Sequence, residues 1–207
     1  MKQILFSAIL MFGAVSASAQ ATATINSACQ LGLNKSPSVR GVKLGMKLDE
    51  VLRLFPQSEE NQSIKAALEK KDTYPNFGVI GFDIFPSDYS TRDQFRGVGV
   101  VRFTFIDDRL TNYVVEYSTP PAGPVWRRVD DWVNKVSESF ALPAVANWQT
   151  DQNQNGLRIL KCQGFEVHAS NQNLRGNLSV STVDRPDIEQ QARREAFEEK
   201  LRRDFKP

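Results

Sequence analysis

The stretch VRFTFIDDRLTNYVVEY, residues 101–117, decides the fold class of this chain. Large apolar side chains alternate with polar ones on both sides of the Asp107-Asp108 pair, as in two half-buried strands joined by a tight turn. The apolar positions are Val101, Phe103, Phe105, Tyr113, Val115 and Tyr117. The stretch therefore predicts a β-hairpin. We expect both aspartates to be solvated turn residues with unshifted pKa values rather than paired catalytic acids.

The residues before the hairpin predict one helix and one further strand. Apolar side chains recur at helical spacing before Pro56, which ends the helix. These side chains are Leu48, Val51, Leu52 and Phe55. Residues 57–72 fit either a second short helix or a solvated loop. Residues 77–85 alternate with a period of two and predict a strand.

The residues after the hairpin repeat the order of helix and then strands. Pro124 fits the first turn of a helix that we expect to reach Phe140, with a wide apolar stripe along it. Further strands are predicted at residues 157–162, 165–169 and 178–180. The sequence therefore predicts an α+β fold, in which short helices pack on an antiparallel sheet and the helix-then-strands pattern occurs twice.

The two ends of the chain differ from this body. Lys2, the apolar run 4–15 and the small residues 16–19 form the three parts of a secretory signal peptide, with cleavage after Ala19. We therefore expect a periplasmic or extracellular protein without a transmembrane segment in the mature chain. The predicted divisions are a signal peptide (1–19), a flexible lead-in (20–38), two halves (39–119 and 120–183) and a charged C-terminal helix (184–207). That helix is interpreted as a solvated helix laid on the domain, with a partner-binding helix or a frayed tail as alternatives.

The chain has two cysteines, Cys29 and Cys162. Export delivers them to an oxidising compartment, so we expect them to form a disulfide. The alternative is lipidation of Cys29, which follows a small residue as the cysteine of a lipoprotein signal does.

Composition and missing motifs exclude several classes of function. The 207 residues include 13 Phe, and so many large apolar side chains argue against disorder. The formal net charge of only +2 argues against a general electrostatic attraction for nucleic acid. The sequence has a single His and lacks a Gly-x-Ser-x-Gly elbow, a phosphate loop and a dinucleotide fingerprint. We expect no catalytic residues, no bound cofactor and no metal site.

Two weaker patterns have ordinary structural interpretations. Residues 151–156 match the opening of a calcium loop, but Cys162 stands where the loop needs a bidentate Glu, so we interpret them as a polar hairpin loop. A catalytic pair of Cys162 and His168 would need a free thiol of low pKa. We expect His168 to be an exposed residue on a strand.

Four residues are the best candidates for a partner surface: Trp126, Arg127, Arg128 and Trp148. Trp and Arg dominate the energetics of protein interfaces because they combine a large contact area with directional hydrogen bonds. For each Trp taken singly, a place in the core is the favoured alternative.

Residues 42–56 resemble the opening of the SmpA/OmlA and beta-lactamase-inhibitor-protein-like modules of exported bacterial proteins. Gly45, Met46, Glu50 and Val51 fit the pattern of those modules, whereas Lys47 stands where they have a capping Ser or Thr. The resemblance implies a helix-plus-sheet protein-binding module of the cell envelope, single or in tandem, without catalysis.

The expected function is therefore non-catalytic binding of another exported or envelope protein. The alternative is a secreted hydrolase whose acidic residues converge only in three dimensions. Two carboxylates with perturbed pKa values in a deep pocket would favour the hydrolase.

Overall fold

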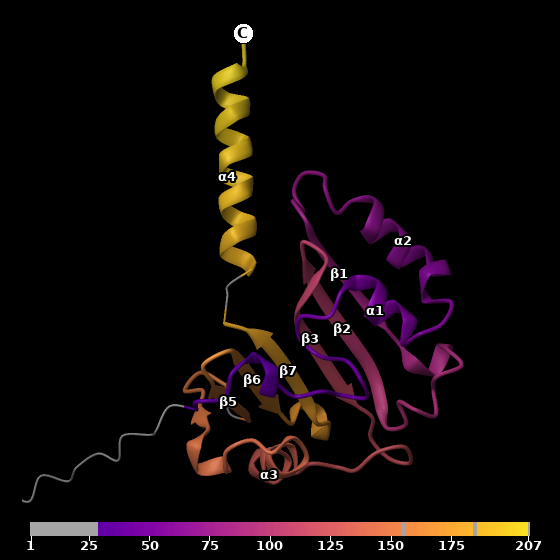
Figure 1. Cartoon of the computed structure of the whole chain (residues 1–207). Helices are drawn as coiled ribbons and strands as arrows, with labels where there is room; N and C mark the ends of the chain where they lie inside the picture. The colour runs from indigo at the N-terminus through magenta and orange to yellow at the C-terminus, as the bar shows by residue number, and fades with distance from the viewer. Residues whose placement is uncertain (1–28, 155, 184–185, 207) are drawn as a thin grey trace, which may run out of the picture.

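The computed structural model describes residues 29–154, 156–183 and 186–206. The predicted signal peptide and residues 20–28 of the predicted lead-in lie outside the described residues. Within these ranges the chain forms a seven-stranded antiparallel sheet in the order β1-β2-β3-β7-β6-β5-β4 (Figure 1). The strands are β1 (Val79–Ile84), β2 (Val98–Ile106), β3 (Arg109–Tyr117), β4 (Gln149–Thr150), β5 (Leu157–Lys161), β6 (Phe165–Ser170) and β7 (Asn177–Thr182). The predicted α+β class is confirmed.

The two predicted halves share this one sheet. β3 of the first half pairs with β7 of the second, with Val115 opposite Leu178 and Tyr113 opposite Val180. The predicted hairpin is formed by β2 and β3, and its turn residues Asp107 and Asp108 both have a positive φ, 47° and 61°. Such left-handed residues match the twist of a two-residue hairpin turn.

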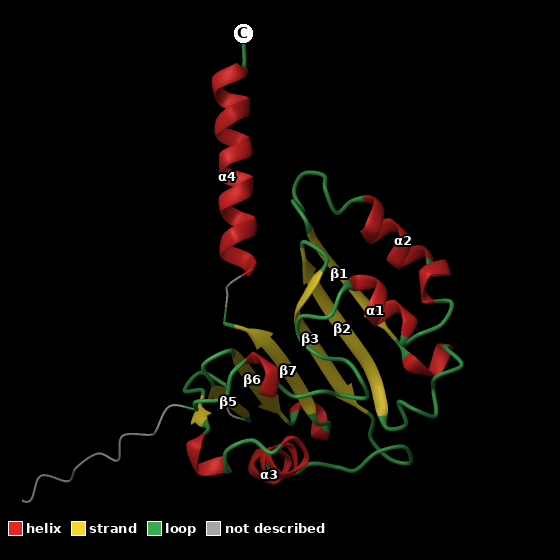
Figure 2. Cartoon of the chain, in the orientation of Figure 1, coloured by secondary structure: helices red, strands yellow, loops and turns green. Residues whose placement is uncertain are grey.

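Three helices lie on one face of the sheet: α1 (Leu48–Arg53), α2 (Gln62–Glu69) and α3 (Val129–Phe140) (Figure 2). α2 decides between the two alternatives for residues 57–72, because the Asn61 side chain caps it by accepting a hydrogen bond from the Ser63 N–H at 2.9 Å. α3 begins at Val129, so Pro124 precedes the helix instead of forming its first turn. The expected start of that helix was five residues too early.

The core lies between these helices and the inward-facing strand residues. Val51 of α1, Ile64 of α2 and Val133 of α3 are fully buried against the sheet. Trp132 of α3 also donates a hydrogen bond from its indole N–H to the Asn177 carbonyl of β7 at 3.0 Å. Burial of this apolar surface is the main favourable contribution to folding.

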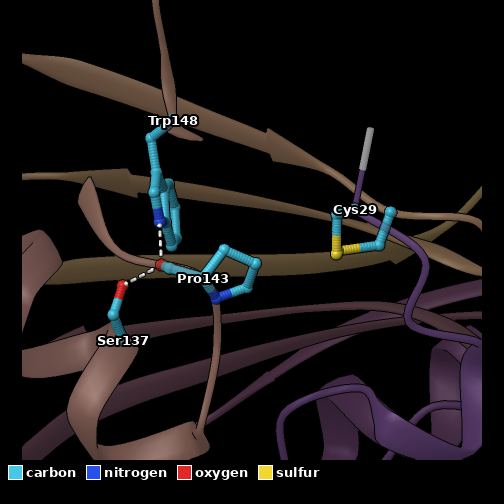
Figure 3. Close-up of a disulfide and its surroundings, with 5 residues drawn as sticks. Cys29, Ser137, Pro143 and Trp148 are labelled. Carbon is cyan, nitrogen blue, oxygen red and sulfur yellow. Dashed lines mark hydrogen bonds between the residues drawn. A yellow bond between two sulfur atoms is a disulfide. The ribbon is translucent and has the colours of Figure 1, made fainter. Parts of the chain in front are cut away.

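The predicted disulfide between Cys29 and Cys162 is confirmed, with an S–S distance of 2.04 Å. Because the Cys29 sulfur is part of this bond, it is not available for the alternative, lipidation. Figure 3 shows the disulfide near Pro143, whose carbonyl accepts hydrogen bonds from Ser137 Oγ at 2.9 Å and Trp148 Nε1 at 3.1 Å. A disulfide is compatible with an oxidising, exported location.

The last helix, α4 (Pro186–Asp204), follows β7, and its C-terminal end projects beyond the sheet (Figure 2). A helix near the C-terminus was predicted and is confirmed. Among the described helices, none combines the length and the apolar character that crossing a bilayer requires.

Candidate functional site

The face of the sheet opposite α1, α2 and α3 is the candidate site. Successive strand residues point to opposite faces, so each strand that buries one set of side chains offers the other set to this open face. On β3, β6 and β7 the exposure alternates between fully buried and half-buried, as expected for a face sheltered only by its own neighbours. In the described chain, the helices that complete the core all pack on the other side.

The strand register arranges the open face in rows. One row runs Thr104, Asn112, Ser181, Glu166 and Lys161 across β2, β3, β7, β6 and β5. The next row runs Arg102, Val114, Ser179, His168 and Ile159 across the same strands. The centre of the face, around Asn112 and Ser179, therefore carries small neutral polar groups, joined by an Asn112 Nδ2 to Ser179 Oγ hydrogen bond of 3.2 Å.

An ion-pair cluster flanks this neutral centre on one side and a His–Glu contact on the other. Arg102 binds Glu116 at 2.5 Å and Asp83 at 3.3 Å on the β1–β3 side. The hydrogen bond to Glu116 is the main cause that raises the pKa of the Arg102 guanidinium. On the other side His168 contacts Glu166. Arg102 is thus paired with carboxylates, and the small groups at the centre, around Asn112 and Ser179, offer hydrogen bonds without a charge of their own.

A groove of about 590 Å³ lies over part of this face. Its lining comes from Thr104, Asn112, His168 and Ser181 of the sheet and from Gln190 of α4. Its size falls within the roughly 300–1,000 Å³ of ligand pockets. α4 therefore forms one wall of the open-face groove.

α4 is held in place by a salt bridge to the hairpin turn. Arg193 Nη1 and Nη2 donate to the two carboxylate oxygens of Asp107 at 2.9 and 2.6 Å, and Nη1 also donates to the Phe77 carbonyl at 2.9 Å. These bonds lower the pKa of Asp107. The expectation of an unshifted pKa was therefore wrong for Asp107, because Arg193, distant in sequence, binds its carboxylate. The Asp107 side chain is 57% exposed and thus solvated, as expected. Asp108 binds Lys71 at 2.9 Å.

An aromatic cluster adds to this docking. The ring of Phe197 lies 5.7 Å from that of Tyr74 and 5.5 Å from that of Phe77, measured between centroids. The Tyr74 hydroxyl donates to Glu198 at 3.0 Å, which raises the pKa of that phenol. α4 thus contacts the loop before β1 through apolar and polar side chains together.

The four residues predicted as a partner surface do not form one surface. Arg127 and Arg128 are exposed, and Trp126 is half-buried with its ring centroid 5.1 Å from that of Trp132. Trp148 is only 5% exposed and packs in the core. Trp126 precedes α3 and Trp148 bonds to the chain just after it, so a helix about 18 Å long separates them. The core alternative holds for Trp148.

The two weak motifs also receive a structural explanation. Cys162 is in the disulfide, so it has no thiol to pair with His168, which lies half-buried on the open face. Asp151 Oδ1 accepts a hydrogen bond from the Asn153 N–H at 2.7 Å, the local bond of an Asx turn. Asn155 of that loop lies outside the described residues. In the ranges that the structure describes, no group of three or more His, Cys, Asp or Glu residues is placed to hold a metal ion.

Sequence reasoning missed the open face itself. Alternation in the strands already assigned Arg102, Thr104, Asn112 and Glu116 to the face opposite the core. It did not indicate that β3 pairs with β7, which joins these residues to Ser179 and Ser181.

Comparisons of the chain with family models, with curated proteins and with solved structures found no match.

Proposed function

We propose that this chain is an exported, non-catalytic module that binds another exported or envelope protein through the open face of its sheet. The observation that carries the proposal is that α1, α2 and α3 all pack on one face of a seven-stranded sheet. The other face keeps half-buried, hydrogen-bonding side chains in regular rows. Such a broad surface suits a protein partner, because standard interfaces bury about 800 Å² on each side.

The charge pattern of the face supports binding over hydrolysis. A carboxylate-based hydrolase needs two carboxylates that converge on a bound substrate. Here Asp83 and Glu116 both bind Arg102, and Glu166 contacts His168. A neutral centre flanked by ionisable groups resembles an interface, in which charged residues are depleted from the core and kept at the rim.

Export is part of the same proposal. The N-terminal pattern of a basic residue, an apolar run and small residues supports a signal peptide cleaved after Ala19. The Cys29–Cys162 disulfide supports a periplasmic or extracellular location. The resemblance of residues 42–56 to envelope modules points to the same class of partner.

The test uses a photo-crosslinking side chain at Ser181, on the open face, and at Ser63, on the exposed side of α2, in cells that export the protein. The mature chain, checked by intact mass to begin at Gln20, is expected to capture one stoichiometric exported protein from position 181 and not from position 63. With that partner purified, Ser179→Arg should raise the Kd at least about tenfold, since it places an unpaired charge in the interface. The matched control Ser63→Arg should leave the Kd unchanged.

Equal capture from both positions, or a Kd unaffected by Ser179→Arg, would rule out the open face as the binding site. Capture of cytoplasmic proteins alone, with an unprocessed N-terminus, would rule out export.

A further inference from the structure

A second groove, remote from the open face, lies against the C-terminal half of α3. It has a volume of about 420 Å³ and opens between α3 and the turn at residues 39–42. Val39 and Val136 form part of its floor and are 4% and 1% exposed. The rings of Tyr117 and Trp132, with centroids 5.0 Å apart and planes at 65°, form an aromatic wall. The groove therefore offers a rigid apolar surface to a ligand of small-molecule size.

Arg40 is held at the mouth of this groove by a tight turn. Val39 and Val42 exchange backbone hydrogen bonds of 3.0 and 2.9 Å, which close a two-residue turn with Arg40 at φ 54° and Gly41 at φ 95°. Both values lie in the left-handed region that such turns require. The exposed Arg40 side chain lines the groove beside Tyr117.

The positive charge of Arg40 also acts on the neighbouring Tyr117 phenol. Burial raises the pKa of the Tyr117 phenol to about 12, and the positive charge of Arg40 opposes that rise. The Arg40 charge therefore acts on the polar end of the groove. A ligand carboxylate bound at that end would be attracted by the positive charge of Arg40.

The remaining polar lining matches this charge. Lys135 adds a second cation, and its contact with Glu138, at 3.9 Å on the exposed side of α3, is a weak surface pair. Ser38 and Ser139 supply hydroxyl donors. The described residues that line the groove include no carboxylate. The chemistry is thus two cations and hydroxyl donors above an apolar and aromatic floor.

We propose that this groove binds a small amphipathic carboxylate, a free monocarboxylic acid with an aliphatic or aromatic body. The carboxylate lies between Arg40 and Lys135, since a guanidinium donates two parallel hydrogen bonds to a carboxylate. The apolar body lies on Trp132, Tyr117 and Phe140. This site is separate from the open face of the sheet, so it does not depend on the proposed protein partner.

The test titrates decanoate and 2-naphthoate into the mature chain, with 1-decanol and decyltrimethylammonium as probes of the same apolar body without the anion. Both carboxylates are expected to shift the Trp132 indole N–H signal in NMR spectra, and the neutral and cationic probes to bind at least about tenfold more weakly. The double variant Arg40→Gln and Lys135→Gln should weaken decanoate binding at least about tenfold. The matched control Lys65→Gln removes an exposed positive charge on α2 and should change nothing.

A second variant tests the groove without altering its charge. Ser139→Trp places a large ring over the groove from the exposed side of α3, and decanoate binding should then be lost while the dispersion of the amide spectrum stays the same. Equal binding of decanol and decanoate would overturn the proposal. So would signal changes at His168 and Ser181 in place of Trp132.

Discussion

At the scale of single residues, the contact between Arg193 and Asp107 shows how position changes the chemistry of a turn. Asp107 occupies a left-handed turn position that suits Asp and Asn, which is a local property. Its ionisation is not local, because Arg193, 86 residues further along the chain, donates to both carboxylate oxygens. A hydrogen-bonded cation favours the charged form of a carboxyl group. The Asp107 side chain therefore both suits the turn and binds α4 through Arg193.

We predict that the Asp107 carboxyl titrates below 3.8, its ordinary value, and that Arg193→Gln moves the midpoint upward. Because the pKa in the folded state is depressed, the stabilisation is present above the unfolded-state pKa and is lost as the pH falls through the folded-state pKa. Its size should be only about 0.2–1 kcal/mol, since the Asp107 side chain is 57% exposed.

Carbon NMR of the carboxyl signal between pH 2 and 6 measures the Asp107 midpoint directly. Arg203→Gln, which removes a positive charge near the far end of α4, is the control and should leave the midpoint in place. Identical midpoints in the Arg193 and Arg203 variants would show that the salt bridge does not form in solution.

At the scale of elements, α4 is a helix whose order depends on few contacts. Isolated helices are marginal in water, so docking against the loop before β1 supplies much of its stability. Phe197, packed against Tyr74 and Phe77, is its main apolar contact, whereas Leu201 and Phe205 are 56% and 74% exposed. The same docking positions Gln190 in the open-face groove.

We predict that Phe197→Ala speeds hydrogen exchange of the α4 amides by roughly tenfold, since each aromatic pair contributes about 0.5–1.5 kcal/mol. Exchange in β6 and β7 should not change, because their hydrogen bonds and core contacts lie elsewhere. Phe205→Ala, at a 74% exposed ring just after the end of α4, is the matched control and should leave α4 exchange as in the wild type. Equal acceleration in both variants would show that the effect does not come from the docking of Phe197, since Ala is a better helix former than Phe and the substitution itself does not weaken the helix.

At the scale of the whole molecule, the disulfide links the start of the described chain to the last strands of the sheet. Cys29 and Cys162 are separated by 133 residues, so the bond closes a loop of about two thirds of the 207-residue chain. In the chain-entropy model a loop of this size is worth about 5 kcal/mol, less any strain. The bond therefore stabilises the shared sheet as a unit.

We predict that the double variant Cys29→Ser and Cys162→Ser loses roughly 2–5 kcal/mol in free energy of unfolding, measured by urea denaturation. Dithiothreitol should produce a similar loss in the wild type and none in the variant. An unchanged urea midpoint would mean that the link restrains little of the unfolded chain.

The sequence by itself determined the α+β class, the hairpin of β2 and β3 and the cysteine pair. The period-two alternation that assigns Phe103 to the core and Thr104 to the other face is local, and so are the turn preferences of Asp107. Only the tertiary structure decided that β3 pairs with β7, that Trp148 is buried and that Arg193 meets Asp107. These outcomes depend on contacts between residues far apart in the chain, and many strand orders satisfy the same local pattern.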